Sequence, residues 1–449
     1  MEKAYISVIG AGLAGCEAAW QIANRGIQVM LYEMKPNKKS PAHHSDTFAE
    51  LVCSNSLKAA RTASAAGMLK QEMRMLNSLL LKCADACSVS AGGALAVNRD
   101  DFSNMVTYYI NQHPNITVVN EEITELPQDE IAVIATGPLT ADLLAENIKA
   151  EFGGALSFFD AAAPIVTAES IDFNSAFFAS RYGKGSGDDY INCPMNKEEY
   201  ESFHAELVGA QRAPLKDFDV QNPKVYEGCM PIEVMAQRGA DTIRFGPMKP
   251  VGLTDPKTGH RPWAVLQLRK ENNQGTLYNL VGFQTNLKFP EQKRVFSMIP
   301  ALKNAEFVRY GVMHRNTFIN SPRLLDADYS LREKHNLFFA GQLTGVEGYM
   351  ESGSSGLLAG INAARLFMGK ETLVLPNVTM MGALAEYISN PSVTCFQPMG
   401  ANIGILPQLS ENIRDKRLKA EKHSLRSFST LESFINENNI QLVLRKLRF

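Results

Sequence analysis

The sequence predicts an α/β protein with a Rossmann-like dinucleotide-binding domain and an α+β domain inserted into it. Three observations lead to this fold class. A glycine fingerprint follows a short N-terminal strand, a strand near residue 340 leads into a glycine-rich loop and a helix, and the stretch between them alternates like β-strands. The chain of 449 residues is long enough for about two or three domains.

The first element is an N-terminal βαβ unit. Residues 5–9, "YISVI", are typical of a buried strand, and "GAGLAG" then precedes a helical stretch and a second strand at residues 27–33. In such a fingerprint the first glycine permits a tight turn, the second lets a pyrophosphate approach the backbone, and the third packs the helix on the strand. The residues predicted to contact the dinucleotide here are Gly10, Ala11, Gly12, Leu13, Ala14 and Gly15.

Glu33 ends the second strand, eighteen residues after Gly15. At this distance an acid accepts hydrogen bonds from the ribose hydroxyls of a dinucleotide. An acid also favours a ribose without a 2′-phosphate, so we expect FAD or NAD rather than NADP. The alternative is a glycine-rich turn in an unrelated α/β unit.

Two later segments favour FAD over NAD. Residues 130–140, "EIAVIATGPLT", are typical of a buried strand that runs into a small-residue turn, as in flavoproteins of the two-dinucleotide-binding type. Residues 336–367 form a strand, a glycine-rich loop and a helix, whose backbone N–H groups can contact a flavin or its pyrophosphate. This segment adds Gly341, Gly348 and Tyr349 to the predicted cofactor-binding residues. No second G-x-G-x-x-G follows a strand, so NADH or NADPH would have to dock transiently.

The segments that predict cofactor binding lie near both ends of the chain, so their domain is discontinuous. We expect an FAD-binding domain of residues 1–160 and 305–449, and an inserted domain of residues 161–304. Alternation in "WAVLQLR" and "LYNLVGFQT" predicts strands joined by a polar turn within the insertion.

The composition is that of an ordinary globular protein. Hydrophobic residues make up 45% and charged residues 20%, and no apolar run is long enough to cross a bilayer. Seven scattered cysteines favour a reducing compartment, so we expect a cytoplasmic protein without a membrane partner or a structural metal. The net charge of −2 does not indicate a nucleic-acid partner, but residues 411–449 carry nine Lys or Arg against five Asp or Glu. This positive region either contacts phosphate or forms a solvated helix face.

Two cysteines lie in contexts unlike those of buried structural thiols. Cys229 in "EGCMP" lies in a turn-forming sequence with acids nearby, and Cys53 in "ELVCSNS" precedes residues that often cap a helix. A helix N-terminus or a positive neighbour would favour the nucleophilic thiolate at either position. The other cysteines are expected to be small buried hydrophobic residues: Cys16, Cys83, Cys87, Cys193 and Cys395.

Seven motifs occur in order between about residue 4 and about residue 410: "GAGLAGCEAAWQ", "ELVCSNSLK", "EGCMPIEVMA", "RFGPMKPVGL", "NLVGFQT", "RYGVMHRNTFI" and "AGQLTGVEGYMES". Together they resemble those of the folate- and FAD-dependent tRNA (uracil-54-C5)-methyltransferase family. The stretch "FQPMGANIGILP" departs from the family pattern at Gly400 and Ile403, which bears only on local packing. Beyond about residue 410 the chain carries little recognisable signal.

The resemblance implies a reaction. A one-carbon unit passes from 5,10-methylenetetrahydrofolate to C5 of uridine-54 in the tRNA T-loop and gives 5-methyluridine, with FADH2 as reductant and NADH or NADPH as external electron source. It also implies that Cys229 adds to C6 of the uracil and that Cys53 is a second functional thiol, a candidate for moving the C5 proton. The division of roles between the two stays open. Candidate contacts to RNA phosphate, folate or flavin are Lys249, His314 and Arg315.

Three alternative functions remain open on the sequence. A related flavin- and folate-dependent enzyme modifies the tRNA wobble uridine, but its chain is longer and has an additional C-terminal helical region. A flavoprotein oxidoreductase acting on a small molecule would leave both thiols structural, and an FAD-bound RNA-binding module would not be catalytic. The motifs around Cys229 and at residues 314–319 favour the methyltransferase. The sequence does not indicate an oligomeric state.

Overall fold

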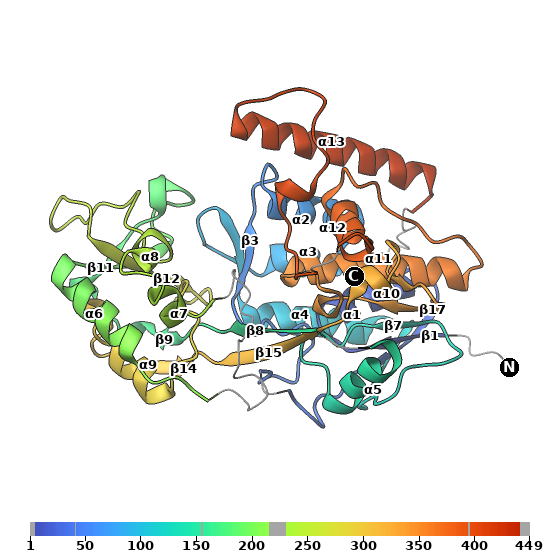
Figure 1. Cartoon of the computed structure of the whole chain (residues 1–449), viewed down its shortest axis with the longest axis horizontal. Coiled ribbons are helices and arrows are strands. Elements are labelled where there is room, and N and C mark those ends of the chain that lie inside the picture. Colours follow the sequence, from blue (N-terminus) through green and yellow to red (C-terminus); the bar gives the residue numbers. More distant parts are fainter. Residues whose placement is uncertain (1–4, 41, 154–155, 215–229, 394–395, 441–449) are drawn as a thin grey trace.

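The computed structural model describes residues 5–40, 42–153, 156–214, 230–393 and 396–440. Two six-stranded sheets form the centres of two lobes, and the chain passes between the lobes through the paired strands β8 and β15 (Figure 1). The predicted α/β fold class is confirmed by this arrangement and by the parallel sheet of the first lobe.

The sheet of the first lobe has the order β16-β17-β7-β1-β2-β6. Strand β1 pairs in parallel with β2 on one side and with β7 on the other, and it is apolar and buried along nearly its whole length, as expected for a strand covered on both faces. The strands are β1 (Tyr5–Ile9), β2 (Gln28–Tyr32), β6 (Ile116–Val119), β7 (Ala132–Ile134), β16 (Ser330–Leu331) and β17 (Lys334–Phe339). The strands predicted at residues 5–9 and 27–33, and the later ones near residues 132 and 336, are thereby confirmed.

Helices α1 (Leu13–Ala23) and α11 (Tyr349–Phe367) pack closely against each other and against this sheet. Two glycines of α11 make the close approach possible. A Cβ at Gly356 would lie 2.1 Å from the carbonyl oxygen of Ala14, and one at Gly360 would lie 2.6 Å from that of Ala18. The two segments predicted to bind the cofactor, about 340 residues apart in sequence, therefore share one side of the sheet.

The first lobe contains further helices and a small second sheet. The helices are α2 (Ala65–Met75), α3 (Leu79–Ala86), α4 (Arg99–Gln112), α5 (Asp142–Phe152), α10 (Ser321–Leu324), α12 (Met380–Ser389) and α13 (Lys416–Glu437), and the small sheet consists of β3 (Ser56–Ala59), β4 (Ser88–Val89) and β5 (Ala94–Val97). Helix α13 runs along the outside of the lobe, at the top of Figure 1.

A buried carboxylate fixes the start of α12. Glu72 of α2 accepts hydrogen bonds from the backbone N–H groups of Met380, at 2.7 Å, and Met381, at 2.8 Å. It also accepts one from the hydroxyl of Ser427 on α13, at 2.5 Å. A carboxylate at a helix N-terminus satisfies unpaired N–H groups and interacts favourably with the helix dipole. One side chain therefore joins three helices.

The sheet of the second lobe is antiparallel, with the order β10-β11-β12-β13-β9-β14. Cross-strand partners share a face: Ile191, Leu268 and Leu280 lie on the apolar face. Adjacent residues such as Arg269 and Asn279 lie on the opposite face. The strands are β9 (Ile165–Thr167), β10 (Phe177–Phe178), β11 (Tyr190–Met195), β12 (Ala264–Lys270), β13 (Leu277–Leu280) and β14 (Phe307–Arg309). The two predicted strands of the insertion are confirmed as β12 and β13.

In the described residues, the second lobe contains the α-helices α6 (Lys197–Gly209), α7 (Ile232–Ala236), α8 (Thr242–Phe245) and α9 (Phe289–Phe296). Strands β8 (Leu156–Ala161) and β15 (Met313–Phe318) pair antiparallel from end to end, so the chain enters and leaves this lobe side by side. None of the helices in the described ranges combines the length and the apolar composition that a membrane-spanning helix needs.

Candidate active site

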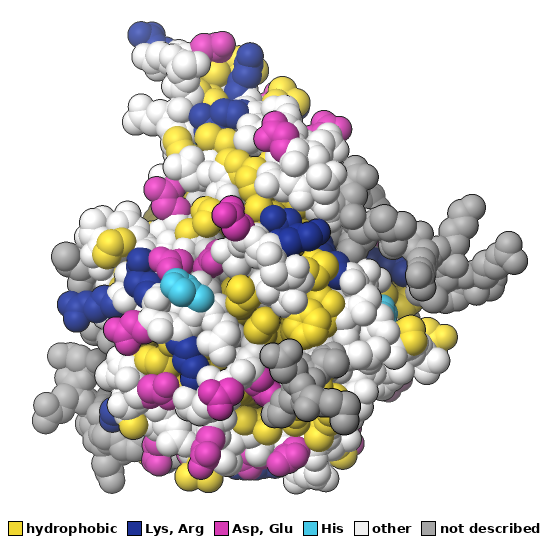
Figure 2. Space-filling model, turned by 90° about the vertical axis from the view of Figure 1, so that its right-hand side faces the viewer, with side chains coloured by type: hydrophobic (Ala, Val, Ile, Leu, Met, Phe, Trp, Pro, Cys, Tyr) yellow, Lys and Arg dark blue, Asp and Glu magenta, His cyan; other side chains and the backbone are white. Residues whose placement is uncertain are grey.

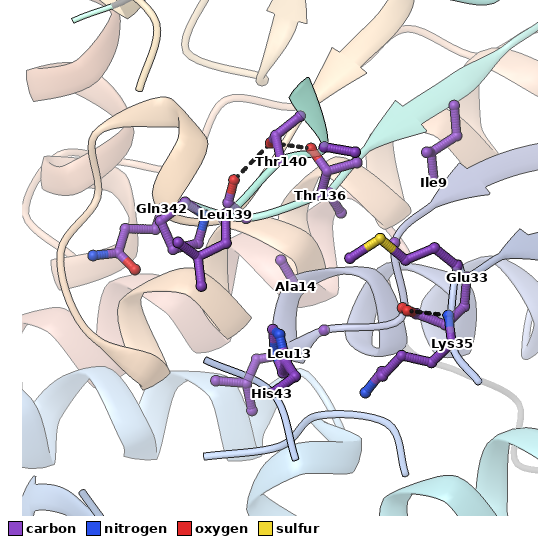
Figure 3. Close-up of a pocket in the computed structure, with 18 of the residues that line it drawn as sticks. Ile9, Leu13, Ala14, Glu33, Lys35, His43, Thr136, Leu139, Thr140 and Gln342 are labelled. Atoms are coloured by element: carbon purple, nitrogen blue, oxygen red, sulfur yellow. Dashed lines mark hydrogen bonds between the residues drawn. The ribbon is translucent and has the colours of Figure 1, made fainter. Parts of the chain in front are cut away.

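A pocket opens at the carboxyl ends of β1, β2 and β7, where open parallel sheets bind their ligands (Figure 3). It contains about 1110 Å³ of empty space, including open solvent at its mouth. Of the predicted cofactor residues, seven line the pocket: Gly10, Gly12, Leu13, Ala14, Glu33, Gly341 and Tyr349. Three are not part of its lining: Ala11, Gly15 and Gly348.

The glycines of the fingerprint act in different ways. A Cβ at Gly15 would lie 1.7 Å from the carbonyl oxygen of Gly10, so Gly15 is needed for packing. A Cβ at Gly12 would meet no protein atom within 4 Å, so space is open above Gly12. That space adjoins the N-terminus of α1, whose free N–H groups and dipole attract anions. The open space and the helix end fit the pyrophosphate of FAD.

Glu33 is buried at the end of β2, with its carboxylate held by the backbone. It accepts hydrogen bonds from the N–H of Ala11 at 2.8 Å and from the N–H of Lys35 at 3.0 Å. A carboxylate has about four acceptor positions, so positions remain for ribose hydroxyls. Ala11 contributes to the site by orienting Glu33 rather than by lining the pocket.

The glycine-rich loop after β17 reaches the pocket from the other side. The N–H of Gly341 donates to the hydroxyl of Ser355 at 2.7 Å, which ties the loop to α11. Gly348 has φ +126°, and a Cβ there would lie 2.2 Å from the carboxylate of Glu351, so only glycine fits. Gly348 therefore shapes the turn that starts α11 and places Tyr349.

Sequence reasoning missed several lining residues, among them Lys35, His43, Thr136 and Gln342. Thr136 belongs to the "ATG" turn that the sequence singled out, so its position could have been named. His43 forms a hydrogen bond with Ser40 at 2.6 Å, and burial together with the charge of Lys35 lowers its pKa. No sequence signal distinguishes His43, because an irregular segment brings it to the pocket.

Cys53 lies next to this pocket in the loop before β3. The hydroxyl of Tyr349 donates to the Cys53 sulfur at 3.0 Å and accepts from the N–H groups of Cys53, at 2.8 Å, and Ser54, at 3.1 Å. Burial raises the pKa of Tyr349 well above its ordinary value, and the neighbouring thiol adds to this, so Tyr349 stays a protonated donor at neutral pH. Because Tyr349 also lines the pocket, one side chain connects the pocket with the thiol.

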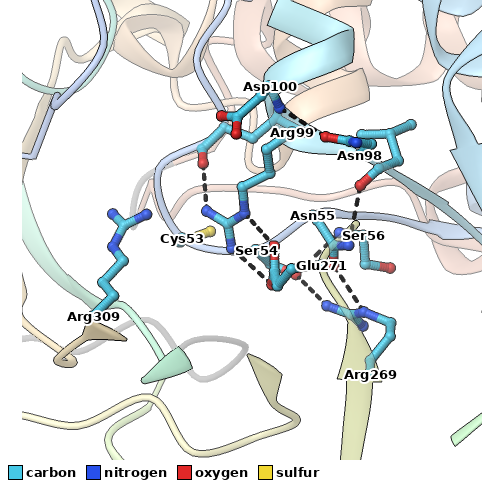
Figure 4. A network of polar contacts seen from close by, with 12 residues as sticks. Cys53, Ser54, Asn55, Ser56, Asn98, Arg99, Asp100, Arg269, Glu271 and Arg309 are labelled. Carbon is cyan, nitrogen blue, oxygen red and sulfur yellow. Dashed lines mark hydrogen bonds and ion pairs between the residues drawn. The ribbon is translucent and has the colours of Figure 1, made fainter. Parts of the chain in front are cut away.

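The expected helix end beside Cys53 is wrong. The residues after Cys53 lead into strand β3, which starts at Ser56, because Ser54 and Asn55 direct their side chains to arginine and backbone partners instead of capping a helix. Positive charge comes from arginines. Arg99 donates to the carbonyl of Leu51 at 2.6 Å, and Arg309 donates to that of Val52 at 2.6 Å. Figure 4 shows both arginines beside Cys53.

Cys229, the predicted nucleophile, lies outside the described residues. The described chain resumes at Met230 and enters α7, where the buried Glu233 accepts from the Thr285 hydroxyl and the Asn286 N–H, each at 2.8 Å. The motif "EGCMPIE" thus has one acid that anchors the segment after the cysteine. Lys249 lies exposed after α8, and the side chains of His314 and Arg315 on β15 are outside the described set.

Four of the other cysteines are free and buried, as expected: Cys16, Cys83, Cys87 and Cys193. Burial raises the pKa of Cys83 to about 12 and that of Cys193 still further, so both thiols are inert. Cys395 lies outside the described residues. Among the side chains that are described, no group of His, Cys, Asp and Glu is arranged to hold a metal ion.

Comparison with known proteins agrees with this geometry. Residues 5–371 match the family model described as "Glucose inhibited division protein A". The chain is 62% identical over 434 residues to the methylenetetrahydrofolate--tRNA-(uracil-5-)-methyltransferase TrmFO of Acetivibrio thermocellus, covering 96% of this chain and 99% of the relative. It is 57% identical over 440 residues to the protein of the same name from Brevibacillus brevis, covering 98% and 100%.

A solved structure shows the same fold. The chain superimposes on GidA of Aquifex aeolicus with a TM-score of 0.70 at 15% identity, covering 97% of this chain and 75% of that one. At this identity the likeness concerns the fold alone. It identifies the first lobe and the inserted sheet as parts of one shared architecture.

Proposed function

The chain belongs to the glucose inhibited division protein A family and, within it, to the methylenetetrahydrofolate--tRNA-(uracil-5-)-methyltransferases, and from this we propose how its residues methylate C5 of a tRNA uridine. The carbon donor is methylenetetrahydrofolate and the cofactor is FAD. Their presence among the reactants accounts for both a dinucleotide pocket and a thiol beside it.

The finer identity of the reactants is part of the proposal. The target is uridine-54 in the T-loop, and the external reductant is NADH or NADPH, docking transiently. The motifs around Cys53, Cys229 and residues 314–319 support the target, and the single dinucleotide fingerprint supports transient docking. We place the reaction in the cytoplasm, where tRNA is modified and thiols stay reduced.

The proposed cofactor site uses the fingerprint and the loop after β17. Gly12 and Leu13 offer N–H groups to the pyrophosphate, Glu33 accepts from the ribose, and Gly341 with Tyr349 closes the other side. When bound and reduced, FAD supplies the electrons that convert the transferred methylene into a methyl group. The observation that carries the proposal is Tyr349, which lines this pocket and donates to the Cys53 thiol.

The thiols perform the chemistry on the uracil. The Cys229 sulfur adds to C6, which makes C5 nucleophilic, and C5 then attacks the one-carbon unit. Cys53 accepts the proton that leaves C5, and the nitrogen that carried the one-carbon unit departs with the electrons of its C–N bond, which leaves a methylene on C5. Two electrons and a proton convert this methylene into methyl as the Cys229 sulfur leaves C6, which restores the C5–C6 double bond. Tyr349 holds the Cys53 sulfur in place, and the neighbouring arginines favour its thiolate.

We also propose the domain limits that go with these roles. Residues 1–160 and 305–449 bind FAD, except that strand β14 (Phe307–Arg309) completes the sheet of the second lobe, and residues 161–304 face RNA and folate. Separate apolar cores in the two lobes support the division. The face of the first lobe in Figure 2 carries Lys, Arg, Asp and Glu side chains interspersed, without a broad area of one sign.

The test of the proposed function is a transfer assay. The protein is incubated with undermodified tRNA, methylenetetrahydrofolate labelled at the transferred carbon, and NADH or NADPH, and the modified nucleosides are mapped. We expect labelled 5-methyluridine at position 54 and none in a tRNA with cytidine there. Label at the wobble position would assign the chain to the related activity, and flavin turnover without labelled RNA would contradict RNA methylation.

The role of Cys229 is tested by Cys229→Ala. Because the C6 addition is lost, we expect methyl transfer to fall by at least roughly 10³-fold while FAD stays bound and yellow. Cys87→Ala, which removes a buried thiol at the end of α3, is the matched control and should retain transfer. Normal transfer in Cys229→Ala would remove this residue from the chemistry.

A further inference from the structure

Strand β12 of the second lobe reaches the Cys53 loop of the first. Arg269, near the end of β12, is 6% exposed. Its Nε donates to Oδ1 of Asn55 at 2.8 Å, and its Nη2 donates to the hydroxyl of Ser54 at 2.8 Å (Figure 4). The rigid guanidinium fork thus holds the two residues that follow Cys53. Asn55 is fully buried and donates in turn to the carbonyl of Lys270 at 2.8 Å.

A second clamp holds the other side of the loop. Arg99, the first residue of α4, forms a buried ion pair with Glu271, with Nε 2.6 Å from Oε2 and Nη2 3.2 Å from Oε1. Glu271 directly follows β12. Through its Nη1, Arg99 donates to the carbonyl of Leu51. Arg99, which Glu271 of the second lobe orients, therefore fixes the loop before Cys53. Arg269, which belongs to the second lobe, fixes the loop after Cys53.

The charges around the thiol come from several elements. Arg99 on α4 and Arg269 on β12 both interact electrostatically with Cys53, and Arg309 on β14 holds the adjacent Val52 carbonyl. The negative groups in this surrounding are Glu271, paired with Arg99, and Glu50, which interacts with Arg309. Among the described residues, Tyr349 on α11 is a further titratable neighbour, and Tyr190 on β11 interacts with Arg269. Positive charge predominates, and cationic neighbours favour a thiolate.

We propose that Arg269 is a positioning residue for Cys53: the second lobe uses it, with the Arg99–Glu271 pair, to hold the thiol in register with Tyr349 and to favour its thiolate form. The inference rests on the proposed function in one respect, that Cys53 is a functional thiol. The loop has no helix or strand of its own at Cys53, so its geometry depends on these long-range bonds. Arg269 acts through Ser54 and Asn55 and by its charge.

The test compares Arg269→Gln and Arg269→Lys in the FAD-bound protein. Alkylation of Cys53 by iodoacetamide is followed by peptide mapping from pH 6 to pH 10, and kcat and KM are measured for methyl transfer. For Arg269→Gln we expect the alkylation midpoint to move up by about one pH unit. We also expect kcat to fall about 10- to 100-fold, with KM for tRNA changed less than about threefold. Arg269→Lys keeps the charge but not the fork, so it should restore the midpoint and only part of kcat.

The matched control is Arg294→Gln. Arg294 is a half-exposed arginine on α9 of the same lobe, paired with Glu206 and Glu291, and its loss should change neither readout. If Arg269→Gln matches this control in both alkylation and kcat, the inference is overturned. If Arg269→Gln does not fold with FAD, Ser54→Ala is used instead. This variant removes the hydroxyl that accepts from Arg269 and changes no charge. An unchanged rate of Cys53 alkylation together with an unchanged kcat would overturn the inference.

Alkylation does not require turnover, so the two proposals fail separately. A protein with the expected shift in Cys53 alkylation but no labelled 5-methyluridine contradicts the proposed function and leaves the positioning role intact. A protein that methylates tRNA normally while Arg269→Gln changes neither readout contradicts the positioning role alone.

Discussion

Gly12 and Gly15, three positions apart, differ in what a side chain would meet. A side chain at Gly15 collides with backbone, whereas one at Gly12 enters the open space of the pocket. Gly12 also has φ −74°, which any residue can adopt. A substitution at Gly12 therefore separates cofactor binding from folding.

We expect Gly12→Val to fold normally and to lose FAD, because the branched side chain would occupy the space above the N-terminus of α1. Flavin absorbance after purification and thermal unfolding of the apoprotein measure the two effects. Gly209→Val is the matched control: a Cβ at Gly209 would also meet no atom within 4 Å, and the residue lies at the end of α6, remote from the pocket. Flavin retained in Gly12→Val at the level of this control would contradict the assigned site.

Among single residues, the sequence predicted those that act within a local motif. It missed those whose partners lie far away in the sequence. The fingerprint identified Gly12 and Glu33 because turn, helix and strand follow one another within about 30 residues. Arg269 stands 214 positions from Asn55, and no local pattern records that bond. The error about a helix beside Cys53 has the same origin, because the polar residues after it bond to distant partners.

Helix α12 depends on a buried carboxylate at its start. Burial raises the pKa of Glu72 to about 7, although the hydrogen bonds from Ser427, Met380 and Met381 act in the opposite direction. Between pH 4.5 and about 7 the folded protein therefore keeps a proton that the unfolded chain releases. The stabilising contribution of this group is fully present below pH 4.5 and is lost as the pH rises through 7.

The prediction concerns the free energy of unfolding between pH 4.5 and pH 8. In the wild type it should fall, through Glu72, by on the order of 3 kcal/mol over this range. In Glu72→Gln this decrease should be absent, and urea unfolding at a series of pH values measures the difference. Glu432→Gln, at an exposed site on α13, is the control and should follow the wild type. If the free energy of unfolding changed with pH in the same way in Glu72→Gln and in the wild type, Glu72 would be ionised over the whole pH range.

Helix α13 shows what charge counting could and could not predict. One side of the helix is buried against the first lobe through His423, Ser427 and Leu431, and Lys416, Lys419 and Lys422 lie on its more exposed side. A solvated helix face is therefore present, which is one of the two interpretations of the positive charge at residues 411–449; the other was a contact with phosphate. The sequence could not show which residues face α2, because the bond between Ser427 and Glu72 joins positions 355 residues apart.

For the molecule as a whole, the sequence predicted three parts that have a local signature. These are the N-terminal βαβ unit, the later strand and helix β17 and α11, and the lobe inserted between them. The strand order of the second lobe was not predictable. Strand β9 lies between β13 and β14, so pairing depends on contacts across more than a hundred residues that alternation does not encode. Nor could the sequence show that the second lobe contributes Arg269 and Glu271 to the surroundings of Cys53.

The ion pair between Arg99 and Glu271 should make the lobes interdependent. Replacing Glu271 by Gln leaves a buried guanidinium without its counter-ion, so we expect a loss of about 3 kcal/mol in the free energy of unfolding. Urea unfolding, followed by flavin and by tryptophan fluorescence, measures it. Glu291→Gln, which breaks an ion pair with the half-exposed Arg294 on the same lobe, should cost much less, because solvent screens this pair. Equal losses in the two variants would show that the Arg99–Glu271 pair is solvated.

The antiparallel pairing of β8 with β15 has an evolutionary consequence. The two strands that connect the lobes lie side by side. A whole lobe can therefore be gained, replaced or altered by changes at this one place, while the path of the rest of the chain stays the same. An ancestral flavin-binding domain could thus acquire a new specificity by exchange of the inserted lobe, while the flavin-binding domain evolved independently.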